Sequence, residues 1–312
     1  MLEGSIRRNL LTTLPALVLL VAMAAITASA SPSFLGETNL ANLSSRLLPM
    51  ALATLGQAIV LFAGCIDLSV GSIISLATAV MATLSVPLGW TAVPVSLGIG
   101  ALCGVVTAAG IDRFRINPLV MSLASAAMIK GVTLLILPSP GGEVDYGFYA
   151  VLFESERLLA PPLIITIAVF ALATVLFGWS RMGRNIYGYG SDPRAAFARG
   201  ASPQRVVYSV YVISGVLAAA AGTVLSIRIL SGDPLIGDAY TLDTVSAAIL
   251  GGVALTGGRG NVLGALFAAA ALVLINNTFN LLELDTNLQS IAKGLIFILA
   301  LVFFMRGKAG EA

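Results

Sequence analysis

Long apolar stretches without charge recur along the whole chain. A bilayer core of about 30 Å is crossed by about 20 apolar residues in a helix, so stretches of this length predict membrane-spanning helices. We expect ten spans, over residues 9–30, 47–66, 68–88, 92–111, 117–137, 162–179, 206–227, 244–255, 262–277 and 288–305. The eighth stretch is too short to cross a bilayer by itself. The pattern predicts an all-α, polytopic integral membrane protein with a single transmembrane domain over residues 1–312.

The first stretch has some features of a signal peptide. Arg7 and Arg8 precede it, and Ala28-Ser29-Ala30 is similar to a cleavage site. Its apolar region is longer than the roughly 7–15 residues of a signal peptide. We therefore expect a retained span.

The charges in the loops predict the orientation of the spans. Most of the 17 Lys and Arg residues lie on one side of the predicted spans, and the loop over 180–205 is the most basic. The loop over 138–161 holds the acids Glu143, Asp145, Glu154 and Glu156. Because Lys and Arg are retained on the cytoplasmic side, we expect both termini in the cytoplasm.

Composition narrows the range of chemistry. The chain is 58% hydrophobic and 10% charged, with a mean hydropathy of +0.97, so its charged residues are too few to cover a soluble core. Histidine is absent, which excludes a Ser/His/Asp triad, a zinc site with His ligands and a haem with a proximal His. We expect no metal site. A net charge of +2 gives no reason to expect nucleic acid as a partner.

The segment over 188–205, within the most basic loop, contains a clearly delimited short helix. An Asp can cap this helix, a Pro occupies its first position and a Gly ends it. The residues of this predicted element are Asp192, Pro193, Arg194, Phe197, Arg199 and Gly200. A separate helix with an aromatic residue between two arginines is typical of a docking element. An ordinary basic loop explains the same residues equally well.

Several polar residues interrupt the apolar stretches. Asp67 is either the N-cap of the following helix or a residue that also lines a solute path. Amides within spans either bond across helices or offer hydrogen bonds to a polar solute. The candidate path residues are Gln57, Asp67, Ser69, Gly71, Asn276 and Asn277. We expect Lys130 and Lys293 to extend to the membrane interface.

A glycine-rich segment over 251–260 follows the short eighth stretch. It ends in Gly257, Gly258, Arg259 and Gly260. No Lys-Ser or Lys-Thr pair follows it, as a phosphate-binding P-loop requires. We expect a tight turn on the cytoplasmic side, in which glycines adopt positive φ and allow close backbone approach.

Several motifs together resemble a known family. The segment Gly64-Cys65-Ile66-Asp67-Leu68-Ser69-Val70-Gly71 is similar to one in permease subunits of bacterial ABC importers for ribose and related monosaccharides. The resemblance continues, in order, through residues 183–187, 247–252, 257–260, 276–277 and 293–295. Cys65 replaces the usual glycine, and Lys130 stands where many relatives have arginine.

The resemblance implies a multi-pass protein of the bacterial cytoplasmic (inner) membrane. Its implied partners are a cytoplasmic ABC ATPase, a periplasmic or lipid-anchored sugar-binding protein, and a second permease copy or paralogue. ATP and magnesium then belong to the ATPase, and this chain has no cofactor. Relatives of this kind contact their ATPase through a short cytoplasmic helix, which favours the docking interpretation of 192–200.

Three other functions are considered. A secondary transporter normally carries several intramembrane charges for coupling to an ion gradient, and here Asp67 is nearly alone. A membrane enzyme needs an acid–base or metal constellation, which scattered carboxylates do not supply. An ABC permease for branched-chain amino acids is the third, and the Asp-Leu-Ser-Val-Gly segment favours a sugar over it.

Overall fold

The computed structural model describes residues 2–154, 161–283, 291 and 294–295, with side chains from Thr13 onward. Within these residues the chain is all-helical, and seven segments are long and apolar enough to cross a membrane. One of them, Val70–Phe114, contains two helices joined by a tight turn. The predicted span over 288–305 lies outside the described residues, so the count of ten spans stays a prediction.

The helices fall into long and short groups. The long helices are α1 (Leu2–Ala30), α2 (Glu37–Phe62), α3 (Val70–Leu88), α4 (Ala92–Phe114), α5 (Pro118–Ile136), α7 (Pro161–Trp179), α10 (Pro203–Ile229) and α12 (Val262–Leu281). The short ones are α6 (Tyr146–Phe153), α8 (Arg181–Ser191), α9 (Pro193–Ala198), α11 (Asp238–Leu250) and the 3-10 helices η1 (Pro32–Leu35) and η2 (Gly89–Thr91).

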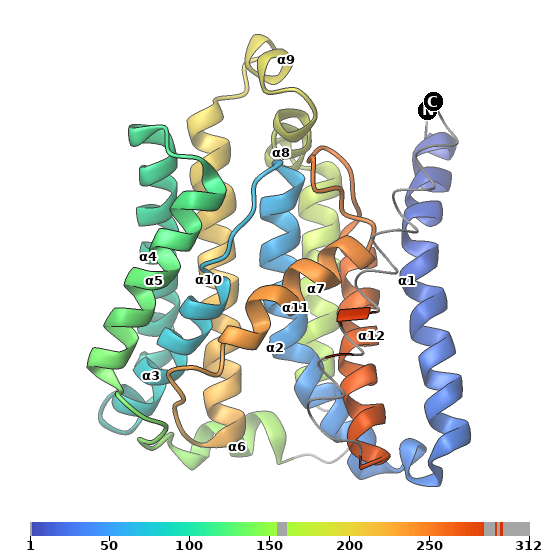
Figure 1. Ribbon diagram of the computed structural model, residues 1–312, viewed down its shortest axis with the longest axis vertical. Helices are drawn as coiled ribbons and strands as arrows, with labels where there is room; N and C mark the ends of the chain where they lie inside the picture. The colour runs from blue at the N-terminus through green and yellow to red at the C-terminus, as the bar shows by residue number, and fades with distance from the viewer. Residues whose placement is uncertain (1, 155–160, 284–290, 292–293, 296–312) are drawn as a thin grey trace.

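Two long helices, α2 and α10, form the centre of the bundle. α10 packs against α2, α3 and α4, while α1 packs against α12 at one edge (Figure 1). Gly100 on α4 and Gly215 on α10 face each other so closely that a Cβ on either would clash with the carbonyl oxygen of the other. Small residues let membrane helices approach in this way, and a bond between the hydroxyls of Ser96 and Thr223 (2.9 Å) adds to the contact.

Two elements stop short of crossing the bundle. After α2 the chain runs back from the top of the bundle towards its middle before α3 begins (Figure 1). α11 crosses the front of the bundle obliquely, and its 13 residues are too few to span a bilayer. The structure therefore contains two interrupted elements, which we call the re-entrant segment (residues 63–69) and α11.

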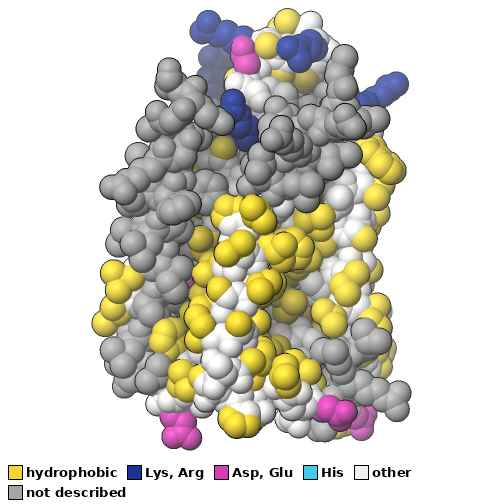
Figure 2. Space-filling model, turned by 90° about the vertical axis from the view of Figure 1, so that its right-hand side faces the viewer, with side chains coloured by type: hydrophobic (Ala, Val, Ile, Leu, Met, Phe, Trp, Pro, Cys, Tyr) yellow, Lys and Arg dark blue, Asp and Glu magenta, His cyan; other side chains and the backbone are white. Residues whose placement is uncertain are grey.

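The ends of the molecule differ in charge. α8, α9 and the start of α1 lie at one end, and α6 lies at the other (Figure 1). Figure 2 shows most of the visible blue Lys and Arg side chains at the end that carries α9, and a few magenta Asp and Glu side chains at the opposite end. Which of the two ends faces the cytoplasm stays a prediction.

Some predicted span boundaries are wrong. α2 begins at Glu37 and not at 47, so Arg46 lies inside a helix and not in a loop. α11 covers Asp238–Leu250 instead of 244–255. Both helices begin before the charge-free residues on which the prediction was based. A helix that reaches water or a polar cavity can carry charged residues on the side that faces it, so the absence of charge does not mark where it begins.

Candidate functional site

The short helix α9 has the termini that the sequence predicts. Asp192 Oδ1 accepts hydrogen bonds from the backbone N–H groups of Arg194 (2.9 Å) and Ala195 (3.1 Å), Pro193 occupies the first position, and Gly200 follows with φ of 87°. Phe197 is 68% exposed. Arg194 and Arg199 are exposed as well. The helix therefore presents an aromatic side chain to solvent between two basic ones.

A second helix that the sequence analysis missed, α8, comes just before α9. The Ser180 hydroxyl caps it by accepting from the N–H of Gly183 (3.0 Å). Gly183, Gly188 and Gly190 lower the helix propensity of this stretch, and the serine cap was the available signal. The predicted segment 188–205 begins inside α8, and α8 and α9 contact each other at the basic end of the molecule (Figure 1).

The end of α8 contacts the glycine-rich segment and the end of α2, in a contact that we call the glycine junction (Gly64, Gly190, Gly257 and Gly258). The N–H of Gly258 donates to the carbonyl oxygen of Phe62 (2.9 Å). A Cβ on Gly190 would clash with that oxygen and with the Gly258 nitrogen, and one on Gly257 would clash with the Gly64 backbone. Three segments far apart in sequence therefore touch through their backbones.

The glycine-rich segment forms the tight turn that the sequence predicts. Gly257, Gly258 and Gly260 have φ of 79°, 71° and 144°, and Arg259 is exposed. The Tyr187 hydroxyl of α8 donates to the carbonyl oxygen of Gly260 (3.2 Å). Burial raises the pKa of Tyr187, so its hydroxyl stays protonated and remains a donor.

Tyr187 also joins α8 to α2. Its ring packs against that of Phe62 with centroids 4.6 Å apart. The aromatic contact lies beside the glycine junction, because Phe62 supplies both the ring and the carbonyl oxygen that Gly258 binds. Tyr187 therefore contacts both the end of α2 and the glycine-rich turn.

Asp67 holds the re-entrant segment against α10. Its Oδ1 accepts from the N–H (2.9 Å) and the hydroxyl (2.6 Å) of Ser69, and its Oδ2 accepts from the hydroxyl of Ser214 on α10 (2.9 Å). The Tyr211 hydroxyl donates to the carbonyl oxygen of Ile66 (2.9 Å). The prediction that Asp67 is the N-cap of α3 is wrong: the N-cap residue is Ser69, and the Asp67 carboxylate bonds to Ser69 and to Ser214 of α10.

Substitutions of Asp67 separate its hydrogen bonds from its charge. Asp67→Leu leaves the buried Ser69 and Ser214 donors without an acceptor, at about 1–3 kcal/mol for each. We expect this variant to lower the melting temperature and the folded yield. Asp67→Asn keeps an acceptor for Ser69, and the Ser214 hydroxyl can accept from the new amide, so we expect near-normal stability. Thermal unfolding of the purified variants measures this, and equal stability of both would contradict the assigned contacts.

The first turns of α3, which follow the re-entrant segment, contact the start of α11. A Cβ on Gly71 would clash with the Thr241 side chain and with the carbonyl oxygen of Gly237. The N–H of Gly237 donates to the Ser75 hydroxyl of α3 (3.0 Å). Gly71 therefore allows the start of α3 to pack closely against the start of α11.

The other polar residues in the spans behave differently from one another. Asn277 Nδ2 donates to Asn39 Oδ1 (2.7 Å), which confirms a bond across helices. Lys130 forms an ion pair with Asp238, the first residue of α11, with Nζ 2.6 Å from Oδ2, and both side chains are partly exposed. Its extension to the membrane interface stays a prediction, and Lys293 lies outside the described residues. Asn276 lines a cavity, and Gln57 is fully buried.

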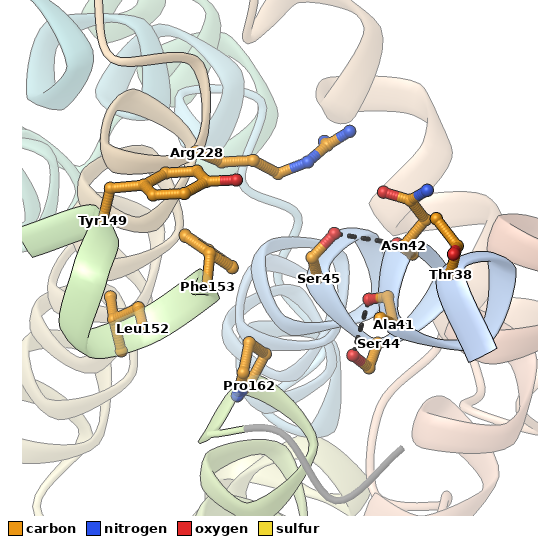
Figure 3. A pocket seen from close by; sticks show the side chains of 10 residues that line it. All are labelled: Thr38, Ala41, Asn42, Ser44, Ser45, Tyr149, Leu152, Phe153, Pro162 and Arg228. Carbon is orange, nitrogen blue, oxygen red and sulfur yellow. Dashed lines mark hydrogen bonds between the residues drawn. The ribbon is translucent and has the colours of Figure 1, made fainter. Parts of the chain in front are cut away.

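Two cavities lie near the acidic end of the bundle, and Arg228 lines both. Figure 3 shows the first, of about 270 Å³, between α2, α6 and α7, with Arg228 beside Tyr149 and directed towards α2. The second, which we call the outer cavity, has a volume of about 200 Å³. The residues lining the outer cavity are Arg46, Met50, Arg228, Ala239, Tyr240, Asp243, Leu272, Val273 and Asn276.

The sequence analysis missed most of the outer cavity. Of its polar residues it singled out only Asn276. Arg46 and Arg228 each lie one residue outside a predicted span, over 47–66 and 206–227, although an arginine next to a long apolar stretch is itself a signal. The cavity brings them together because α2 and α10 both extend past their apolar parts.

Comparison with known proteins identifies the chain. Residues 39–301 match the family described as the permease component of the branched-chain amino acid transport system. The chain belongs to this permease family. It is a multi-pass protein of the bacterial inner membrane and a transport component, not a catalytic one.

Individual relatives match along most of the permease. The ribose import permease protein RbsC of Escherichia coli (strain K12) is 32% identical over 295 residues, which cover 92% of this chain and 91% of the relative. RbsC of Haemophilus influenzae is 30% identical over 295 residues, 91% of this chain and 90% of the relative. The L-arabinose transport system permease protein AraH of E. coli K12 is 31% identical over 276 residues, 87% and 84% of the two chains. No solved structure matches.

Proposed function

We propose that this permease is the membrane-spanning subunit of an ATP-driven ABC importer for a monosaccharide. The similarity to sugar permeases along most of the chain carries this proposal: relatives named for ribose, L-arabinose and D-allose transport are 28–32% identical to it over 276–295 residues. They favour a sugar over a branched-chain amino acid, although the family description names the latter.

The proposed partners supply what the chain lacks. Its sequence has no Walker motif, so ATP and magnesium bind to a separate cytoplasmic ABC ATPase, and the chain needs no cofactor of its own. A periplasmic or lipid-anchored binding protein delivers the sugar at the outer end. A second copy or a paralogue completes the transmembrane pair.

The proposed coupling route starts at α9, within the cytoplasmic loop 188–205. Phe197 enters a cleft of the ATPase, while Arg194 and Arg199 pair with acids at its rim. Closure of the ATPase moves α8 and α9 together, and the glycine junction passes this movement to the re-entrant segment and the turn before α12. The route ends at Asp67 and Gly71, where the interrupted elements change the access to the solute path.

The proposed orientation is open to a direct test. We expect alkaline phosphatase fused after Tyr149, at the acidic end, to be active, and the same enzyme fused after Ala196, in the basic element, to be silent. Phosphatase folds only outside the cytoplasm, so its activity reports the side of each fusion. The opposite pattern would place α9 outside and exclude contact with an ATPase.

The proposed substrate class is tested by uptake in cells. A strain without ribose, arabinose and allose permeases receives this chain with its ATPase and binding protein. We expect uptake of at least one labelled aldopentose or aldohexose, and no uptake of leucine. Uptake of leucine without any sugar would move the permease to the amino acid branch of the family.

A further inference from the structure

A polar stripe runs along α2 from the outer cavity into the bundle. Arg46, Met50, Thr54 and Gln57 are spaced by four, four and three residues, so their side chains share one face of the helix. Arg46 and Met50 line the outer cavity, while Thr54 and Gln57 lie deeper, at 0% exposure. This face of α2 therefore runs from the lining of the outer cavity into the packed interior.

Four side-chain polar atoms of this stripe have no hydrogen-bond partner in the described part of the structure. They are the Nε of Arg46, the Oγ1 of Thr54, and both amide atoms of Gln57. Buried polar atoms are almost always paired, because an unpaired one costs about as much as a lost hydrogen bond. Among the described residues these four are the only buried side-chain polar atoms without a partner, and all four lie on one face of α2. Unpaired polar groups of this kind destabilise a packed core, but they can form hydrogen bonds with a polar solute.

The outer cavity has the chemistry of a sugar site. The guanidinium groups of Arg46 and Arg228 donate hydrogen bonds, Asp243 can accept them, and Tyr240 and Asn276 can do both. Met50, Leu272 and Val273 supply apolar surface. A monosaccharide is complementary to this lining: its hydroxyls donate and accept hydrogen bonds, and its C–H groups pack against apolar side chains.

The deeper pair distinguishes between kinds of solute. Thr54 and Gln57 are three residues apart, adjacent on the helix, and uncharged. They can bond to hydroxyl groups but cannot neutralise a carboxylate or an ammonium group, whose burial without a partner is very unfavourable. The interior therefore fits a neutral polyhydroxylated solute better than an amino acid.

We propose that a neutral aldose binds in two successive positions, first in the outer cavity and then at Thr54 and Gln57, whose unpaired groups bond to its hydroxyls. This inference rests on the proposed function and adds the residues that contact the solute. It also explains why α2 keeps a buried glutamine where leucine would pack better.

The test compares transport with stability in Gln57→Leu and Thr54→Val. Each variant is reconstituted in proteoliposomes with the ATPase and the loaded binding protein, and labelled sugar uptake is measured beside ATP hydrolysis. We expect a several-fold loss of sugar transported per ATP, with binding-protein-stimulated hydrolysis retained. We expect the melting temperature of the purified variants to be equal or higher, because an unpaired buried group is removed.

A matched control and a second variant complete the design. Thr133→Val removes an equally buried hydroxyl that is already bonded within its own helix, to the carbonyl oxygen of Ile129 (2.8 Å), and should leave transport unchanged. Gln57→Met keeps an unbranched side chain in case leucine prevents folding, and should lose transport in the same way.

The outcomes separate this inference from the proposed function. Normal sugar transport by both α2 variants would overturn the inference. A loss of transport that parallels a fall in melting temperature would also overturn it, because that is the result expected if the residues only stabilise the fold. If the unchanged permease imported no sugar at all, the proposed function itself would fail.

Discussion

Phe197→Asp is expected to abolish the stimulation of ATP hydrolysis by the loaded binding protein, while the permease remains folded in the membrane. Phe197 is 68% exposed on α9, so the fold does not need it. An aromatic residue buried at an interface commonly contributes about 2 kcal/mol or more, which is roughly a 30-fold change in affinity. A buried aspartate adds a desolvation cost. Co-purification with the ATPase and stimulated hydrolysis in proteoliposomes measure the effect.

The chain offers a matched control for this substitution. Phe114 is the last residue of α4 and is 75% exposed. Phe114→Asp makes the same chemical change away from α9, so we expect normal stimulation. Normal stimulation in the Phe197 variant would show that α9 is not the contact with the ATPase.

Gly190→Ala is expected to uncouple transport from ATP hydrolysis. Its Cβ would clash with the carbonyl oxygen of Phe62 and with the nitrogen of Gly258, which bond to each other at 2.9 Å. The two backbones must therefore separate, and this contact is lost. We expect a large loss of sugar transported per ATP in proteoliposomes, with the ATPase still bound to α9.

Gly188→Ala is the control on the same helix. A Cβ there meets only the Cβ of Ala196, at 4.0 Å, which is an ordinary contact. Alanine in a helix interior is favoured over glycine by about 0.5–1 kcal/mol, so we expect equal or higher stability and normal transport. Equal transport by the two variants would remove the glycine junction from the coupling route.

Features set by local sequence could be predicted. Asp192, Pro193 and Gly200 delimit α9 through interactions within a few residues, and the structure confirms each of them. The positive φ of Gly257 and Gly258 follows from the same kind of local rule. Apolar runs likewise predicted most of the long helices.

Features set by contacts between distant segments could not be predicted. Asp67 is a plausible N-cap from its neighbours alone, but Ser214, 147 residues away, determines where its carboxylate points. Lys130 is positioned by Asp238 in the same way. The glycine-rich segment predicted close backbone approach at Gly257 and Gly258, but its partners, Gly190 of α8 and the end of α2, are far away in sequence and could not be predicted.

The central claim is that this permease moves a sugar only when a separate ATPase drives it. The direct measurement is accumulation of labelled sugar in proteoliposomes that contain the purified permease, its ATPase and its loaded binding protein. We expect accumulation that requires ATP hydrolysis and all three components. Accumulation by the permease alone, driven by a proton or sodium gradient, would contradict the account.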